Sequence, residues 1–286
     1  MIFYANNGGS IGKIEESMMK EKVKQIILDS GYLKPTYDAK RMVDFQSRYD
    51  TLWNYACKNE LMNTAMSLRL LISFFFPVNK EDIRYSKNDN YSSETYVDHA
   101  LWVANMLMDI HPEITKEEED IALSVAICHT LIEKIDFEHK GQELVDLFHM
   151  DPEILELIYI NLRDKTQKDM TNYYKRIQEN KLALLVKLAD RSNIVGNLYL
   201  SSIQVAQGYV RDTKQNFFSM CIYGKEHYPD LYLAFGLLME KMRCLVDVAD
   251  ILSTRFVNQE NMLNNEILAL KEENARLRKA IRQLKK

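Results

Sequence analysis

The chain has 286 residues, a net charge of −4 at pH 7, 47% hydrophobic residues and 27% charged residues, and a chain of this size buries a sizeable core without disulfides. Only nine glycines and five prolines are present, about 5% of the chain against an average near 12%, which argues against a sandwich, a barrel or a glycine-looped nucleotide fold. The negative charge argues against a generic nucleic-acid binder, and the longest uncharged apolar run, residues 70–78, is far shorter than the roughly 20 residues of a membrane span.

The first half of the chain predicts helices separated by polar segments. Apolar residues recur at helical spacing, and Pro77 and Pro112 end two of the periodic stretches. Thr115 and Glu118 form a Thr-x-x-Glu capping box, which predicts a helix start at that point. The predicted elements are a loose N-terminus over 1–16, a short helix over 18–28, helices from 37 and over 60–76, a polar loop over 79–95, and helices over 96–110 and 115–135.

The second half continues the helical pattern, with no strand alternation and no internal repeat. We predict short helices over 141–148 and 152–162, a long helix over 171–210 with a break near Gly196 or Gly208, and helices over 212–224 and 229–286. The predicted fold class is therefore all-α. The predicted domains are an N-terminal helical extension over 1–59, a helical-bundle domain over 60–255 and a C-terminal coiled coil over 256–286.

Three polar residues continue apolar helical stripes that should face the core. They are His99, His129 and Asp190. Taken singly, a core histidine that is satisfied by one hydrogen bond is the better explanation for each imidazole. A buried carboxylate, in contrast, needs an ionic partner or a metal. Two histidines and one aspartate from three helices would make a metal site, but periodicity alone does not show that they converge.

Three motifs around these residues resemble one family. They are Tyr-Val-Asp-His at 96–99, Ala-Ile-Cys-His-Thr-Leu-Ile-Glu at 126–133 and Val-Lys-Leu-Ala-Asp-Arg-Ser-Asn at 186–193. They resemble the HD-domain hydrolases of the RelA/SpoT type, which remove pyrophosphate from the alarmone ppGpp. The resemblance covers about residues 60–255 and extends to Lys-Glu-His-Tyr-Pro at 225–229, which is similar to the small, hydrolase-only members. The synthetase half of the long family enzymes has no room in this chain.

The resemblance implies a metal-dependent pyrophosphohydrolase with an HD-type helical bundle. His99, His129 and Asp190 would hold the divalent metal, usually manganese, and Glu133 would help to position water. Arg191 and Asn193 become candidate nucleotide contacts, and a guanosine polyphosphate or a related nucleotide becomes the expected ligand.

Four site positions depart from the family pattern. The aspartate that follows the second histidine is Thr130 here, and a neutral hydroxyl is a poor ligand for a hard cation. Lys134 replaces a carboxylate, Asn90 replaces an arginine, and Ile194 replaces the last asparagine of the third motif. Asp136 lies about two helical turns after His129 and offers an alternative carboxylate.

These departures leave two functions open. The first is a metal-dependent phosphohydrolase that acts on ppGpp or a similar nucleotide, with its activity kept or reduced. The second is a catalytically inactive pseudoenzyme of the same family that works as a dimeric nucleotide sensor or protein-interaction module. The scattered cysteines (Cys57, Cys128, Cys221 and Cys244) and the absence of a secretory signal at Met1 predict reduced thiols and a cytoplasmic location.

The C-terminal segment carries a heptad repeat with Leu at d positions and Ile or Asn at a positions. Its seam residues are Leu263, Ile267, Leu270, Asn274, Leu277, Ile281 and Leu284. Ile at a with Leu at d favours a parallel two-stranded coil, and a single Asn at a fixes the register. Glu266 and Glu273 at g can pair with Lys271 and Arg278 at e of a partner chain. The alternative is an amphipathic helix folded back onto its own domain.

Overall fold

The computed structural model describes residues 39–73, 96–110, 112–132, 142–143, 145–163, 169–198 and 201–284. These ranges contain helices and no strand, which confirms the predicted all-α fold class. The helix predicted over 18–28, the loop predicted over 79–95 and most of the N-terminal extension lie outside the described residues. Helix α2, the first to be described, covers the apolar pattern that predicted a helix from residue 37.

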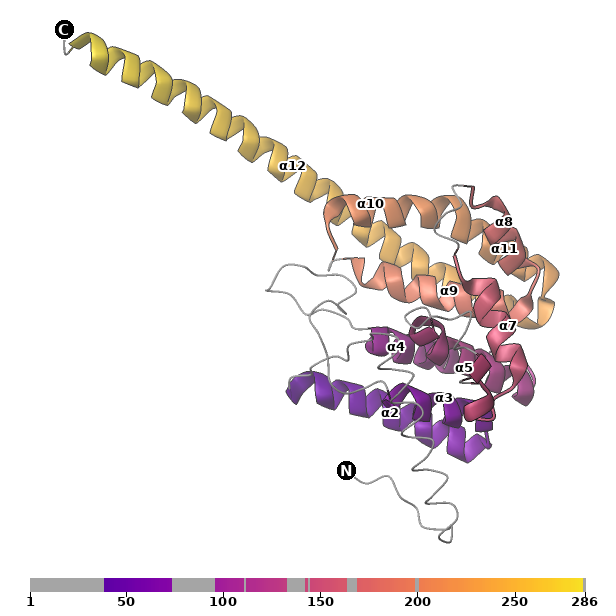
Figure 1. The fold of residues 1–286 in the computed structure, drawn as a ribbon. Coiled ribbons are helices and arrows are strands. Elements are labelled where there is room, and N and C mark those ends of the chain that lie inside the picture. The colour runs from indigo at the N-terminus through magenta and orange to yellow at the C-terminus, as the bar shows by residue number, and fades with distance from the viewer. Residues whose placement is uncertain are drawn as a thin grey trace.

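The helices stack in layers (Figure 1). Helices α2 and α3 lie against α4 and α5, which in turn lie against α9; the C-terminal helices cover the opposite side of α9. The main helices are α2 (Ala39–Asn59), α3 (Met62–Ser73), α4 (Tyr96–Asp109), α5 (Lys116–Ile132), α7 (Pro152–Asn161), α8 (Thr171–Gln178), α9 (Lys181–Gly196), α10 (Ile203–Asp212), α11 (Phe218–His227) and α12 (Tyr232–Leu284). Short π-helical and 3-10 segments, Thr213–Phe217 and Pro229–Leu231, flank α11.

Helix α9 is the centre of the bundle. Thirteen of its sixteen residues are buried, because it packs against α4 and α5 on one side and against α12 on the other. A helix that is covered on all sides is expected to be apolar throughout. The polar residues that α9 nevertheless buries, among them Asp190, Arg191 and Asn193, therefore need partners inside the protein.

Side chains fix where several helices begin. The predicted capping box is confirmed, because Glu118 N donates to Thr115 Oγ1 at 3.2 Å and Thr115 N donates to Glu118 Oε2 at 2.9 Å. The buried Asp120 carboxylate of α5 accepts a hydrogen bond from Thr64 N at 2.7 Å and one from Asn63 N at 2.9 Å. These amides belong to the first turn of α3, so α5 caps the helix that packs on it.

The long helix predicted over 171–210 is three helices. One break follows Gly196, at one of the two predicted glycines, whereas Gly208 lies inside α10. The other break was not predicted. It falls at Asn180, whose side chain accepts a hydrogen bond from Ala183 N at 2.9 Å and so caps α9.

Helix α12 is continuous and leaves the bundle partway along its length (Figure 1). Its first part packs on α9, α10 and α11, and Ser253 is its last buried residue. From Thr254 to Lys279 its side chains are exposed, except for the half-buried Val257. None of the helices in the described part of the chain, α12 included, combines the length and the apolar character that a membrane crossing requires.

Candidate metal site

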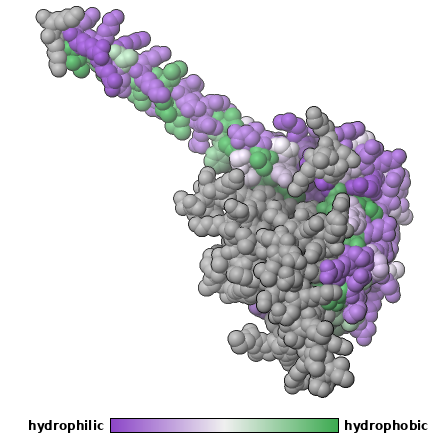
Figure 2. All heavy atoms as spheres, viewed as in Figure 1, coloured by the Kyte–Doolittle hydropathy of each residue, from purple (hydrophilic) through white to green (hydrophobic). Residues whose placement is uncertain are grey.

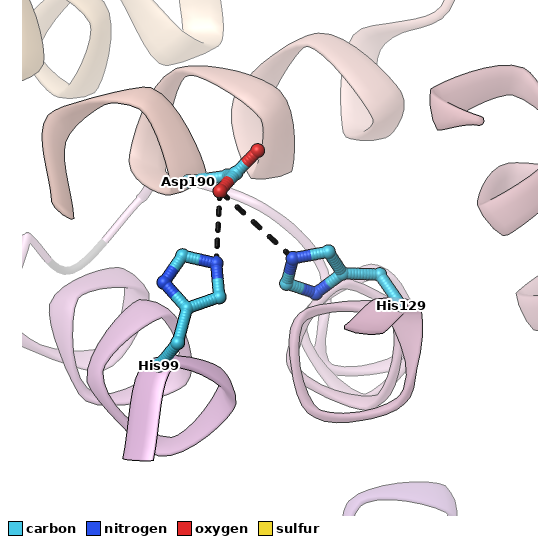
Figure 3. A group of neighbouring side chains, drawn as sticks. All are labelled: His99, His129 and Asp190. Atoms are coloured by element: carbon cyan, nitrogen blue, oxygen red, sulfur yellow. Dashed lines mark ion pairs between the residues drawn. The ribbon is translucent and has the colours of Figure 1, made fainter. Parts of the chain in front are cut away.

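Three helices bring His99, His129 and Asp190 together (Figure 3). His99 comes from α4, His129 from α5 and Asp190 from the central helix α9. Asp190 Oδ1 lies 2.9 Å from His99 Nε2 and 3.9 Å from His129 Nε2, and one ligand atom of each residue lies within 4.8 Å of the others. All three side chains are buried. The convergence that periodicity could not show is therefore present.

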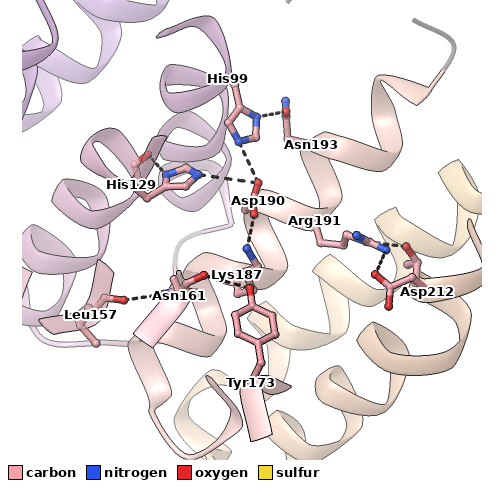
Figure 4. Close-up of polar contacts among 12 residues, drawn as sticks. His99, His129, Leu157, Asn161, Tyr173, Lys187, Asp190, Arg191, Asn193 and Asp212 are labelled. Atoms are coloured by element: carbon pink, nitrogen blue, oxygen red, sulfur yellow. Dashed lines mark hydrogen bonds and ion pairs between the residues drawn. The ribbon is translucent and has the colours of Figure 1, made fainter. Parts of the chain in front are cut away.

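Hydrogen bonds fix the second nitrogen of each imidazole (Figure 4). His129 Nδ1 donates to the Ala126 carbonyl at 2.8 Å, because a carbonyl oxygen can only accept. His99 Nδ1 lies 2.6 Å from Asn193 Oδ1, which is also an acceptor. Both contacts place a ring proton on Nδ1, so Nε2 is the nitrogen of each imidazole that faces Asp190.

A positive charge is needed between His99 Nε2 and Asp190 Oδ1. In neutral His99 both atoms would be acceptors, and two acceptors 2.9 Å apart repel unless a proton or a cation lies between them. Adjacent ligands that bind one metal at about 2.1 Å are about 3 to 3.4 Å apart. The His99–Asp190 separation of 2.9 Å is close to that range, and the His129–Asp190 separation of 3.9 Å is longer, so His129 would have to move slightly closer to bind the same ion. Two imidazoles and one carboxylate also form a recurrent donor set for divalent metals, so these residues fit such an ion.

Lys187 binds the other carboxylate oxygen of Asp190. Its Nζ lies 3.0 Å from Asp190 Oδ2, and both residues belong to α9. Burial alone would raise the pKa of the Asp190 carboxyl, but the Lys187 ammonium and the two nearby imidazoles hold that pKa well below its usual range. Asp190 is therefore ionised and shared between a lysine and the histidine pair.

Lys187 and the residues around it were not predicted from the sequence to belong to the site. The Lys187 ammonium lies 5.9 Å from the centre of the Tyr173 ring, and Tyr173 OH donates to the Asn161 carbonyl at 3.1 Å. The available signal was the spacing of Lys187 and Asp190, because residues three apart on a helix are neighbours. The tertiary contacts with α7 and α8 had no comparable signal.

Arg191 lies on a different side of α9 from the histidine pair (Figure 4). Its guanidinium donates to Asp212 Oδ2 at 2.6 Å and to Thr213 Oγ1 at 2.8 Å, and it stacks 4.2 Å from the centre of the Phe217 ring. These contacts attach α9 to the π-helical turn after α10. Asn193, the other candidate nucleotide contact, instead lies in the cluster as the partner of His99.

The positions that depart from the family pattern are only partly described. Thr130 is buried beside His129 on α5, and Ile194 is buried in the core at the end of α9. Asn90, Glu133, Lys134 and Asp136 lie outside the described residues. The structure therefore has a hydroxyl at 130 and a hydrocarbon at 194, where the family resemblance expects polar site groups.

Comparisons with known proteins do not identify a family. A scan against protein-family models finds no match to the chain, and a search of curated proteins finds no relative. The resemblance to the HD-domain hydrolases therefore rests on the three motifs, whose residues His99, His129 and Asp190 are the ones that the fold brings together.

Proposed function

We propose that the protein is a metal-dependent phosphohydrolase of the HD type that acts on a guanosine polyphosphate or a related nucleotide. The convergence of His99, His129 and Asp190 in one buried cluster supports it. These residues would hold a divalent ion, with Nε2 of each imidazole and Oδ1 of the carboxylate as ligand atoms. Such an ion polarises phosphate oxygens and lowers the pKa of a bound water.

The protein's own residues prepare this site before any ion binds. Asn193 and the Ala126 carbonyl orient the two imidazoles, which avoids a rotamer search on binding. Lys187 keeps Asp190 ionised. The resemblance gives Glu133 the role of positioning the attacking water, and it makes the 3′-pyrophosphate of ppGpp the expected leaving group.

The second candidate is an inactive member of the same family that senses a nucleotide or binds another protein. Thr130 favours it, because a buried hydroxyl replaces the expected carboxylate ligand. Lys187 favours it too, because its ammonium already neutralises Asp190, the one carboxylate among the described residues of the cluster. Both features weaken the attraction of the site for a divalent cation.

Calorimetric titration with Mn²⁺ and, separately, with Zn²⁺ tests the metal site. We expect one ion per chain, with binding lost in His129→Ala and kept in His227→Ala, since His227 is exposed and lies outside the cluster. Thr130→Asp should tighten binding at least tenfold, because it supplies a second carboxylate beside His129. Stoichiometric binding that survives His129→Ala would place the ion elsewhere in the chain.

Hydrolysis of ppGpp by the metal-loaded protein separates the two candidates. Release of pyrophosphate at about 1 per second or faster, abolished by Asp190→Asn, supports the enzyme. Nucleotide binding without turnover, even in the Thr130→Asp variant, supports the inactive sensor. A metal-loaded protein that neither binds nor hydrolyses ppGpp rules out this nucleotide as the ligand of either.

A further inference from the structure

The outer part of α12, after Val257, exposes an apolar stripe that no other described part of the chain covers. Its seam side chains Leu263, Ile267, Leu270, Leu277 and Ile281 are each 48 to 58% exposed. Figure 2 shows apolar side chains alternating with polar ones along this projecting helix. In the described part of the chain the helix projects away from the domain (Figure 1), which argues against the folded-back alternative. No described residue of the domain covers the stripe, so we consider a second chain as its cover.

The exposed stripe continues the face of α12 that the domain buries. The heptad register of the seam runs backwards from Leu263 through Phe256 to Ser253, Val246, Met242 and Phe235. The last four are all buried against the domain. The same face of α12 is thus covered by the protein's own domain as far as Ser253. Beyond that residue, the face is available to an external partner.

The charged side chains beside the stripe favour a second copy of this chain as the partner, in parallel orientation. In a parallel pair of copies, Glu266 and Glu273 at g face Lys271 and Arg278 at e of the second chain. In an antiparallel pair, glutamates would face glutamates and basic residues would face basic residues. Identical copies in parallel are therefore attractive, and a self-complementary stripe is the pattern expected of a two-fold interface.

Two polar residues at a positions specify the alignment. Asn274 donates to the carbonyl of Leu270 in the single chain, and in an in-register pair it faces its own copy. Glu260 occupies the a position between Phe256 and Leu263. It would face its own copy as well, and like charges at a seam are destabilising, so Glu260 marks the upper end of the continuous apolar seam.

We propose that the protein is a parallel, in-register homodimer joined through α12 from Leu263 to Ile281. Both domains, and with them the two His99–His129–Asp190 clusters, then lie at the same end of the coil, related by its two-fold axis. This inference is independent of the proposed function, because it uses no residue of the candidate metal site.

A pair of matched leucine variants tests the interface in the full-length chain. Leu270 and Leu268 are exposed to similar extents in the single chain, 52% and 57%, so neither substitution removes a core contact of the monomer. Only Leu270 lies on the seam. In sedimentation at about 10 µM, well above the Kd expected of a stable dimer, the natural protein and Leu268→Glu should be dimers and Leu270→Glu a monomer. A monomeric natural protein, or a dimeric Leu270→Glu, would overturn the proposal.

Oxidative cross-linking tests the direction and register. In a background with the exposed Cys57 and Cys244 replaced by serine, Asn274→Cys should form a disulfide dimer, because a-position side chains meet their own copies in a parallel coil. Ala275→Cys, one residue further on and off the seam, should stay reduced. Glu260→Ile should also slow dimer dissociation. A dimer that cross-links at neither position, or a trimer or tetramer, contradicts the parallel pair.

Discussion

At the scale of single residues, Asp190 has two competing sources of positive charge. One carboxylate oxygen contacts Lys187 and the other faces His99 and His129. In the metal-free protein the lysine offsets the buried negative charge, which would otherwise be costly. When a divalent ion enters, the same ammonium becomes a like charge a few ångströms away. We therefore expect Lys187 to stabilise the metal-free fold and to lower the affinity of the cluster for a divalent ion.

Replacement of Lys187 by methionine separates these two effects. We expect Lys187→Met to raise the affinity for a divalent ion roughly tenfold or more, because a nearby positive charge is removed. The metal-free protein should unfold at a lower temperature, and saturating metal should recover most of the loss. Calorimetric titration and thermal unfolding measure the two quantities.

Lys181→Met is the control for that experiment. Lys181 is on the same helix and also pairs with carboxylates, those of Glu118 and Asp230, but it does not contact the metal ligands. Its loss should change stability slightly and leave metal affinity unaltered. Equal metal affinities for Lys187→Met and the natural protein would show that Lys187 does not compete with the ion.

The sequence predicted the members of the cluster better than their arrangement. His99, His129 and Asp190 could be singled out because each interrupts an apolar stripe of a helix. Their convergence depends on how α4 and α5 pack against α9, and helical periodicity contains no information on packing between helices. The same limit applies to Asn193, whose amide reaches His99 across 94 residues of sequence.

At the scale of elements, the helices were predictable where local signals coincide. Thr115 and Glu118 provide two reciprocal caps, and both form. The break at Asn180 was missed because asparagine is compatible with an exposed position inside a helix as well as with a cap. The tertiary structure decides between these alternatives, since α8 and α9 have to turn at this point to pack against each other.

Gly224 on α11 shows how closely the C-terminal elements pack. A Cβ atom at this residue would lie 2.8 Å from the Phe235 ring and 3.1 Å from Leu184 Cδ2. Phe235 is fully buried, so the ring has little room to move. Glycine therefore permits the close contact of α11 with α12 and α9.

Two glycine-to-alanine substitutions should change stability in opposite directions. Gly224→Ala is expected to destabilise the protein by about 1–3 kcal/mol through overpacking. Gly208→Ala, in the exposed middle of α10 with nothing within 4 Å of the new Cβ, should stabilise it by up to about 1 kcal/mol, since alanine has the higher helix propensity. Urea unfolding at equal protein concentration compares the two, and a Gly224→Ala protein as stable as Gly208→Ala would contradict the packing.

At the scale of the whole molecule, α12 belongs both to the helical domain and to the projecting C-terminal segment. As far as Ser253 it completes the core that encloses α9, and beyond Val257 its described side chains are exposed. An isolated helix of this kind is marginal in water without a partner. The folding of the domain and the order of the outer helix should therefore be separable, with association needed only for the second.

Truncation after Arg255 tests this separation. The shortened chain keeps every buried residue of α12, so it should fold, with a thermal midpoint that no longer depends on protein concentration. It should sediment as a monomer and keep the metal affinity of the full chain, because His99, His129 and Asp190 lie well inside the retained domain. Circular dichroism, sedimentation and calorimetry on one preparation give all three results. A truncated chain that stays dimeric would place an interface within the domain. A truncated chain that fails to fold would show that residues after Arg255 are needed for the stability of the domain.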